Sequence, residues 1–371
     1  MNIVMRQFLG ENHSWSVVGW GIAQSLINKN QNVDLFSTDG IKNIPLPLKK
    51  NIIGFSGENS LKMNGKIPDT NYDLAISYTA MINFSSYLSH GKKKIGIWCY
   101  EWAGKNVLPN GFAKNYKYCD ILAAPSQFSK QVFIDSGVPE SKIKVIPHGV
   151  DNSFFNGTST IALPTKKKYK ILANIAQNHL RKNIPGLLDV YGKAFAKEDD
   201  VCLILKAKDK KITFPFEVSL NDCFNKFYEK YKNHAEIKVI SEFIPDMSAL
   251  YRSVDAFFTL PFCEGFLVPG LESIASGKLV IAPNWGGQVD FLNDSNSLLV
   301  SGKEVRANPR SMYWESKNNA IWFEPDIDDA VDKLKYAYQN FNALNAKVEL
   351  QRNDIYNKYN WDSITEQLLN C

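Results

Sequence analysis

The chain has 371 residues, of which 44% are hydrophobic and 22% charged, and its formal net charge at pH 7 is +5. This length suits two domains better than one core, and the composition is that of a globular protein. We find no apolar run of membrane-spanning length, and no basic helix, zinc finger or RNA-binding signature. We therefore expect neither an integral membrane protein nor a nucleic-acid-binding protein.

The N-terminus and the cysteines predict a cytoplasmic protein. Residues 1–6 read directly as a strand, without the pattern of a signal peptide. Six scattered cysteines, with no Cys-x-x-Cys pair, favour free thiols over disulfides or a zinc site. Short basic runs at 92–94, 166–168 and 206–211 are typical of solvated strand ends, or of weak contact with anionic lipid at the cytoplasmic face of a membrane.

The first part of the chain alternates strand-like and helix-like segments. Strands are predicted at 3–8, 33–36, 72–77, 94–98, 121–124 and 142–146. A loop is expected over 10–21 and a helix over 22–28. A second helix over 127–136 has Ser126 as its cap and Gly137 as its end. This alternation predicts a parallel sheet covered on both faces.

A turn-rich, polar stretch from Pro147 to Lys170 then predicts a domain boundary. We expect an N-terminal domain over 1–155, with 350–371 packing back on it, and a C-terminal domain over 165–349. Both are predicted to be Rossmann-like α/β domains that face a central cleft, where ligands of such sheets bind. The tail over 328–369 is nearly all helix-like and could cross back to the first domain.

After this boundary the alternation restarts. Strands are predicted at 169–174, 201–205, 237–240 and 256–260, with helices at 183–196 and 219–233. Aromatic residues recur at helical spacing in the second helix, which predicts a buried core stripe of Phe224, Phe227, Tyr228 and Tyr231.

Glu264 and Glu272, eight positions apart, are the most informative residues. Glu264 is predicted on the loop after 256–260, and Glu272 in the first turn of a helix over 269–276. Backbone N–H groups at a helix start bind anions. Two carboxylates around such a site suit a ligand with a central diphosphate and hydroxyls at both ends, such as a nucleotide-sugar. The alternative is that Glu272 only favours the helix dipole.

These segments resemble glycosyltransferase family 4, the retaining enzymes with the two-Rossmann-domain GT-B fold. Residues 264–272 are similar to the family's Glu-x7-Glu motif, and 181–183 to its basic phosphate-binding step. Two further parts of the family pattern are matched by 124–128 with 146–151 and by 285–288. The resemblance covers most of the chain, and residues 97–109 and 322–326 resemble a branch in which mannosyl transfer is common.

Three positions depart from the family pattern. Ile175-Ala176 stands where members often carry Gly-Arg, so one phosphate-binding arginine is either missing or replaced by another residue. Leu267 stands where a glycine is common, which implies a tighter loop near the sugar. His148 replaces the Asn of a Pro-Asn-Gly turn.

The resemblance implies a donor site in which Lys182, assisted by Arg181, binds the diphosphate and neutralises its charge. The alternative is a solvated Arg-Lys step at a helix start. Glu264 would accept hydrogen bonds from the sugar hydroxyls near the anomeric centre, and Glu272 would take the ribose hydroxyls. Backbone contacts to the donor are implied for Gly10, Gly265, Phe266 and Leu267.

On the acceptor side the resemblance is weaker. Glu101, between aromatic residues, is predicted to orient or deprotonate the acceptor hydroxyl, and His13 and Trp102 to lie nearby. The alternatives are a strand edge with a paired Glu and a structural His. Residues 326–328 spell Asp-x-Asp, but they follow Pro325 at a helix start, so capping explains them better. We expect no essential metal or other cofactor.

The implied reaction moves a hexosyl group from GDP-mannose or a UDP-hexose to a hydroxyl of a saccharide or lipid-linked acceptor in cell-surface glycan biosynthesis, with retention. Rivals are an epimerase or phosphorylase on the same fold, or a non-catalytic carbohydrate-binding scaffold. An NAD-dependent oxidoreductase is disfavoured because Gly19-Trp20-Gly21 lacks the third glycine of the dinucleotide fingerprint.

Overall fold

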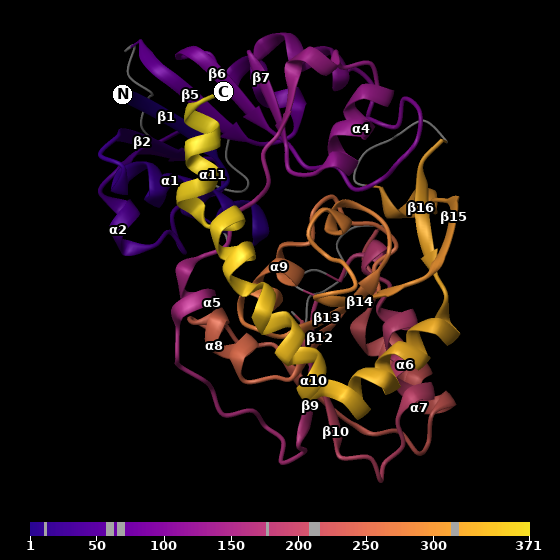
Figure 1. The fold of residues 1–371 in the computed structure, drawn as a ribbon. Coiled ribbons are helices and arrows are strands. Elements are labelled where there is room, and N and C mark those ends of the chain that lie inside the picture. Colours follow the sequence, from indigo (N-terminus) through magenta and orange to yellow (C-terminus); the bar gives the residue numbers. More distant parts are fainter. Residues whose placement is uncertain (11–12, 57–62, 65–70, 176–177, 208–215, 313–318) are drawn as a thin grey trace. The chain divides into compact units, whose positions relative to one another are not determined.

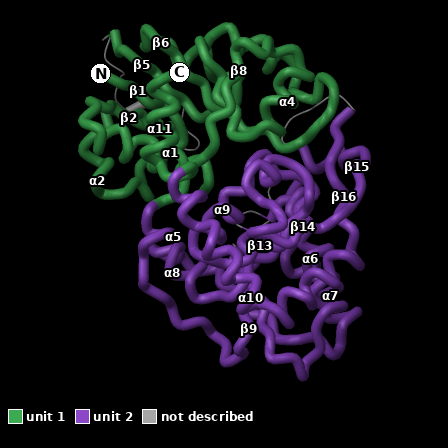
Figure 2. Tube along the Cα trace, viewed as in Figure 1, with its two compact units in different colours: residues 1–151, 358–371 green, residues 152–357 purple. Residues whose placement is uncertain are grey.

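The computed structural model describes residues 1–10, 13–56, 63–64, 71–175, 178–207, 216–312 and 319–371 (Figure 1). They form two compact units (Figure 2). Unit 1 comprises residues 1–151 and 358–371, and unit 2 comprises residues 152–357. Each unit is an α/β structure with its own parallel sheet.

The sheet of unit 1 has the strand order β4-β3-β2-β1-β5-β6-β7-β8. Neighbouring strands are parallel, except that β3 and β4 are antiparallel. The loops after β1 and β5 meet where the order reverses, which is where such sheets bind ligands. The strands are β1 (Asn2–Gln7), β2 (Asn32–Ser37), β3 (Ile52–Ser56), β4 (Met63–Asn64), β5 (Tyr72–Tyr78), β6 (Gly91–Ile97), β7 (Ile121–Ala124) and β8 (Ile143–Val145).

Helix α1 of unit 1 begins at Ser14, so the predicted loop over 10–21 is wrong beyond His13. Gly19 and Gly21 favour a loop by their local preference, but both lie inside the helix. Gly21 is needed there for packing, since a Cβ at this position would lie 2.0 Å from the Trp361 ring. The other helices are α2 (Leu46–Lys49), α3 (Phe84–Tyr87), α4 (Gln127–Asp135) and the C-terminal α11 (Trp361–Leu369), with short 3-10 turns at Met81–Asn83, Ala113–Tyr118 and Glu140–Lys142.

The C-terminal helix α11 packs on α1 inside unit 1 (Figure 1). The Ser25 hydroxyl of α1 donates a hydrogen bond to Oδ1 of Asp362 at 2.5 Å and lies 2.7 Å from the Thr365 hydroxyl. The predicted return of the tail to the first domain is confirmed by these contacts. The predicted helix start at Ser126 is confirmed as well, since its hydroxyl accepts the Ser129 N–H at 3.0 Å.

The sheet of unit 2 has the order β11-β10-β9-β12-β13-β14, and all its strands are parallel. This is the Rossmann order, in which strands are added on one side of β9 up to β11 and then on its other side from β12 onwards, so that the switch point lies between β9 and β12. The strands are β9 (Tyr169–Asn174), β10 (Val201–Lys206), β11 (Glu236–Ile240), β12 (Ala256–Phe258), β13 (Leu279–Pro283) and β14 (Ser297–Val300). A separate antiparallel hairpin consists of β15 (Gly302–Arg306) and β16 (Ile321–Pro325).

The helices of unit 2 connect these strands, and α10 then leaves the unit and is kinked at Asn340. They are α5 (Asn152–Asn156), α6 (Ile184–Ala194), α7 (Leu220–Lys230), α8 (Met247–Arg252), α9 (Val268–Ala275) and α10 (Ile327–Tyr359), with 3-10 turns η4 (Leu180–Lys182), η5 (Gly287–Asp290) and η6 (Pro309–Ser311). None of the helices in the described ranges combines the length and apolarity that crossing a bilayer requires. All six cysteines carry free thiols, as predicted.

Two local expectations for unit 2 are wrong. Because α9 begins at Val268, Glu272 lies in its second turn rather than its first. The aromatic residues of α7 are not a uniform core stripe: Phe227 is buried, whereas Tyr228 is exposed and stacks on Phe224. Spacing identified one helical face, but α7 packs on α6, where Phe227 lies against Gly192, and Tyr228 stays exposed.

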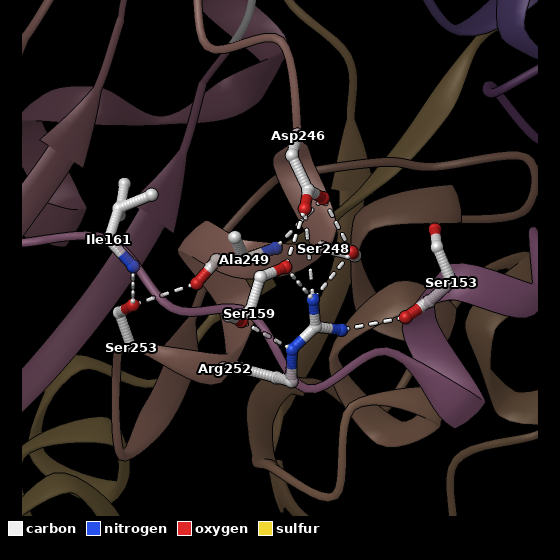
Figure 3. Close-up of polar contacts among 8 residues, drawn as sticks. All are labelled: Ser153, Ser159, Ile161, Asp246, Ser248, Ala249, Arg252 and Ser253. Atoms are coloured by element: carbon white, nitrogen blue, oxygen red, sulfur yellow. Dashed lines mark hydrogen bonds and ion pairs between the residues drawn. The ribbon is translucent and has the colours of Figure 1, made fainter.

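The segment that follows unit 1 in the chain is fixed to α8 by Arg252 (Figure 3). Its guanidinium donates hydrogen bonds to the Ser153 and Ser159 carbonyl oxygens, both at 2.7 Å. Asp246 accepts a hydrogen bond from the Ser159 hydroxyl at 2.8 Å and also caps α8. The Ile161 N–H donates to the Ser253 hydroxyl at 2.8 Å. This irregular stretch therefore belongs to the hydrogen-bond network of unit 2.

Candidate functional site

The loops after β9 and β12 lie together at the switch point of unit 2. The first carries Arg181 and Lys182 in η4, and the second carries Glu264. The two loops are tied by their backbones, because the Phe262 N–H donates to the Arg181 carbonyl oxygen at 2.8 Å. Residues 82 positions apart in the chain are thus brought into one site.

Both cations of η4 contact one oxygen of Glu264. Nη1 of Arg181 lies 2.9 Å from Oε1 of Glu264, and Nζ of Lys182 lies 2.5 Å from the same atom. The Arg181, Lys182 and Glu264 side chains are only 10%, 15% and 8% exposed. The cluster therefore carries a net charge of +1. Because little water surrounds these side chains, their electrostatic interactions are weakly screened.

Glu264 is ionised at neutral pH. Burial raises the pKa of its carboxyl group, but the adjacent Arg181 and Lys182 cations outweigh burial, so that the pKa lies below its ordinary value. An ionised carboxylate only accepts hydrogen bonds. Glu264 is thus suited to hold hydroxyl groups rather than to donate a proton.

His179 and Asn183 shape the turn that presents the two cations. Nδ1 of His179 accepts the Arg181 N–H at 3.0 Å, and burial together with the neighbouring Arg181 and Lys182 cations lowers the pKa of His179 to about 2. The imidazole is therefore neutral. Asn183 has the left-handed conformation (φ 51°) and caps α6 by accepting the Gly186 N–H. Ala176, at the departure from the family pattern, lies outside the described residues.

The Gly286-Gly287 loop closes over the Glu264 segment. The Gly287 N–H donates to the Glu264 carbonyl oxygen at 2.9 Å. A Cβ on Gly287 would lie 1.9 Å from the Gly265 carbonyl oxygen, so only glycine fits there. Phe266 is buried and packs on Phe291, with ring centroids 5.2 Å apart.

Glu272 is half-buried on α9 and hydrogen-bonds to the hydroxyl of Tyr251, a residue on α8. The Tyr251 hydroxyl also accepts a hydrogen bond from Nδ2 of Asn174 at 3.3 Å. Burial, followed by the charge of Glu272, raises the pKa of Tyr251 well above its ordinary value, so Tyr251 is a neutral donor. These contacts orient the Glu272 carboxylate.

In unit 1 the predicted residues Gly10 and His13 surround a carboxylate that the sequence did not single out. Oδ1 of the buried Asp39 accepts the Leu9 and Gly10 N–H groups, both at 2.7 Å. Nε2 of His13 lies 3.6 Å from Oδ2 of Asp39, and Nδ1 of His13 accepts the Ser16 N–H as the cap of α1. The turn signal Thr38-Asp39-Gly40 after β2 was the available clue.

Glu101 is half-buried on the loop after β6, beside Tyr78. Its aromatic neighbours Trp98, Tyr100 and Trp102 are buried, and they pack on one another with ring centroids 5.3 and 5.5 Å apart. This packing gives Trp102 a structural role. Its predicted contact with an acceptor stays a prediction, as does that of Glu101.

Trp15 is a half-exposed aromatic residue of unit 1 that the sequence reasoning did not single out. Trp15 stacks on Tyr78, with centroids 5.2 Å apart, and contacts Phe8 edge-on. The Tyr78 hydroxyl hydrogen-bonds to Nε2 of the buried His148 at 3.1 Å. Burial lowers the pKa of His148 to about 3. Trp15 therefore brings aromatic surface beside His13 and Gly10.

The Asp-x-Asp sequence serves as a helix cap, as predicted. Oδ1 of Asp326 accepts the Asp328 and Asp329 N–H groups at 2.9 and 3.1 Å. Within the described ranges, no group of three or more His, Cys, Asp and Glu side chains is placed to hold a metal ion.

No protein-family model matches the chain. The sequence is similar to an uncharacterized glycosyltransferase of Methanocaldococcus jannaschii, with 22% identity over 268 residues. The match covers 70% of this chain and 61% of that protein, so the chain spans less than two thirds of the relative's length.

Solved structures match the fold over the whole chain. HepE of Anabaena in complex with UDP-glucose has a TM-score of 0.69 at 14% identity, covering 100% of this chain and 98% of HepE. Sucrose-phosphate synthase of Thermosynechococcus elongatus has a TM-score of 0.70 at 12% identity, with coverage of 100% and 98%. The two Rossmann-like units therefore have the GT-B fold, as predicted.

Proposed function

We propose that this chain is a retaining glycosyltransferase that moves a hexosyl group from a nucleoside diphosphate sugar to a hydroxyl of a saccharide or lipid-linked acceptor. The observation that carries the proposal is the buried Glu264 carboxylate with two cations on one oxygen. It lies on a fold shared with a protein crystallised with UDP-glucose. That neighbour favours a UDP-hexose as the donor, and the family resemblance favours GDP-mannose.

The proposed roles follow from charge. Lys182 and Arg181 stabilise the diphosphate as the bond to the sugar breaks, in a site where few waters screen them. Glu264 accepts hydrogen bonds from the sugar hydroxyls, and Glu272 from the ribose. Because these cations take the charge of the leaving group, the reaction needs no resident cofactor, and we expect turnover to persist in EDTA.

On the acceptor side we assign Glu101 to orient or deprotonate the attacking hydroxyl, with His13 nearby. The chain's location is proposed to be the cytoplasm, at the membrane face where cell-surface glycans are built. Glu101→Gln is expected to lower turnover and to change its pH dependence. An unchanged pH profile with full turnover would remove Glu101 from the mechanism.

The donor is tested by a thermal-shift screen of UDP-, GDP-, ADP- and dTDP-sugars. A true donor at a hundredfold its Kd stabilises the folded protein by about 2.7 kcal/mol. Products are then analysed with a saccharide acceptor or with phosphate, because phosphorolysis or epimerisation without transfer would favour the rival enzymes. No stabilisation by any of the four donors contradicts the proposal.

Glu264→Gln separates nucleotide binding from catalysis. Turnover should fall by about 10²- to 10³-fold, the usual effect of removing one group that stabilises a transition state. Binding of UDP or GDP without sugar should persist or tighten, because glutamine leaves the Arg181 and Lys182 charges unneutralised for the diphosphate. A matched control is Glu236→Gln, a carboxylate of β11 paired with Lys238 at 3.0 Å outside the site. Full turnover in Glu264→Gln contradicts the assigned role.

Weak contact with anionic lipid is proposed for the segment 41–50 of unit 1. Its Ile41 and Leu46 side chains are 41% and 79% exposed, and the segment contains no acidic residue. Three exposed lysines flank them: Lys42, Lys49 and Lys50. Each lysine contributes about 1 kcal/mol near an anionic leaflet. The Asn43 N–H donates to the Gly10 carbonyl oxygen at 3.0 Å, which places the segment beside the proposed substrate loop.

Vesicle sedimentation checks this contact. We expect binding to phosphatidylglycerol vesicles that weakens with salt and is lost when the three lysines are replaced by glutamine. Leu46→Asn should weaken binding, and Leu350→Asn, an equally exposed leucine (79%) of unit 2, should not. Equal binding to phosphatidylcholine and phosphatidylglycerol would contradict the proposal.

A further inference from the structure

The hairpin β15–β16 belongs to unit 2 but is not part of its six-stranded sheet. It is joined instead to the loop that carries Glu264. The Phe323 N–H donates to the Phe262 carbonyl oxygen at 2.8 Å. The Trp322 ring stacks on the Phe262 ring, with centroids 4.2 Å apart and planes 26° apart. The hairpin therefore holds Phe262 through both its backbone and its side chain.

The hairpin also holds the loop that closes over Glu264. Nε1 of Trp285 donates a hydrogen bond to Oε1 of Glu304 on β15 at 2.8 Å. Trp285 stacks on Phe323, with centroids 6.1 Å apart and planes 11° apart. Trp285 is followed directly by Gly286 and Gly287, whose backbone lies against the Glu264 segment. The loop that carries Glu264 and the loop that closes over it thus share one support.

The opposite side of the Glu264 loop is held by η4. The Phe262 N–H donates to the Arg181 carbonyl oxygen at 2.8 Å, and Nη1 of Arg181 donates to the Cys263 carbonyl oxygen at 3.1 Å. Thr259 still donates its N–H to the Ile281 carbonyl oxygen of β13 at 3.0 Å, but residues 260–267 form neither helix nor strand. The position of the Glu264 carboxylate relative to Arg181 and Lys182 depends on these two supports.

We infer that Trp322 is a positioning residue: the hairpin β15–β16 clamps the Glu264 loop against η4 and thereby sets the rate of sugar transfer rather than the affinity for the nucleotide. The inference rests on the proposed function for the reaction concerned. A displacement of about 1 Å in a reacting group costs on the order of 10²-fold in rate. Trp322 is 7% exposed, so removing its ring leaves a gap directly behind Phe262.

The test compares Trp322→Ala and Trp322→Phe with two controls. Phe227→Ala removes a buried aromatic group of α7 that packs on Tyr231, and Lys303→Ala removes an exposed side chain of the same hairpin that pairs with Glu324. For each variant kcat, the donor KM, the Kd of UDP or GDP and the Tm are measured. Hydrogen exchange of the amides at 262–268 is measured without substrate.

We expect kcat of Trp322→Ala to fall at least tenfold, while its Kd for the nucleoside diphosphate changes less than threefold. Trp322→Phe should retain most of the wild-type kcat. Amide exchange at 262–268 should be faster in Trp322→Ala. Phe227→Ala should lower the Tm with kcat retained, and Lys303→Ala should change neither.

Two outcomes overturn the inference. One is wild-type exchange at 262–268 in Trp322→Ala, whatever the activity. The other is a loss of kcat matched by an equal loss of nucleotide affinity. Wild-type protein that is inactive with all four donor classes refutes the proposed function instead, and the exchange result still decides whether the hairpin clamps the loop.

Discussion

At the scale of single residues, Leu267 carries the clearest strain. It is the N-cap of α9, directly before Val268, and has the left-handed conformation with φ 70° and ψ 62°, where a residue with a Cβ is disfavoured by about 1–2 kcal/mol. Its side chain is nevertheless 4% exposed, so burial offsets the strain. The leucine that departs from the family pattern is thus kept in place by its own packing.

Replacing Leu267 separates these two effects. Leu267→Ala loses buried contacts, which costs about 2–5 kcal/mol, and keeps the strain. Leu267→Gly loses the same contacts but relieves the strain, so it should be more stable than Leu267→Ala by about 1–2 kcal/mol and less stable than the wild type. Urea unfolding of the three proteins measures this. If both variants had equal stability, the left-handed backbone would be unstrained.

At the scale of elements, side-chain hydrogen bonds hold several irregular segments of unit 2. The turn η4 and the Glu264 loop are held in this way at the candidate site, and so is the segment that runs from α5 to Ile161. Arg252 is the clearest case, since its planar fork reaches two carbonyl oxygens and the Ser159 and Ser248 hydroxyls (Figure 3). A lysine has the same charge, but its single ammonium group cannot reach these separate acceptors as the three guanidinium nitrogens do.

Arg252→Lys should therefore free the segment that leads into unit 2. Phe154 and Phe155 are 8% and 7% exposed in α5, and chymotrypsin should cleave after them faster in the variant. Arg306→Lys, on the exposed edge of the hairpin, serves as the control. Cleavage at the wild-type rate in Arg252→Lys would mean that other contacts hold this segment.

At the scale of the whole molecule, buried neutral histidines make folding sensitive to acid. His148 titrates near its ordinary pKa of 6.5 when unfolded, whereas burial lowers its pKa to about 3 in the fold. Between these values the unfolded chain binds the extra proton, so stability falls as the pH falls from about 6.5. The same sign holds for His179 in the other unit.

His148→Asn removes one such group and replaces it with the residue of the family's turn. From pH 7.5 to 5.0 the wild type should lose about 2 kcal/mol of stability through His148, because the slope approaches 1.36 kcal/mol per pH unit only below the unfolded-state pKa. The variant should lose about 2 kcal/mol less than the wild type over the same interval. Urea midpoints at pH 7.5 and 5.0 for both proteins test this. An identical pH dependence in the variant would show that His148 is protonated within the fold.

The sequence by itself determined two α/β units with parallel sheets, the positions of most strands, the cap of α4 and the loops that carry Lys182 and Glu264. These features follow from periodicity and turn chemistry, which act over a few neighbouring residues. The start of α1 was hidden, because two glycines weaken its local signal, while Gly21 suits the close approach of Trp361.

Only the tertiary structure decided how distant segments meet. Two cations share one oxygen of Glu264, Asp39 holds the Gly10 loop, and Trp322 supports Phe262, all through contacts between residues far apart in the chain. It also showed that Trp98, Tyr100 and Trp102 are buried and pack on one another. Local patterns specify each element, but the order of strands in the sheet decides which loops become neighbours.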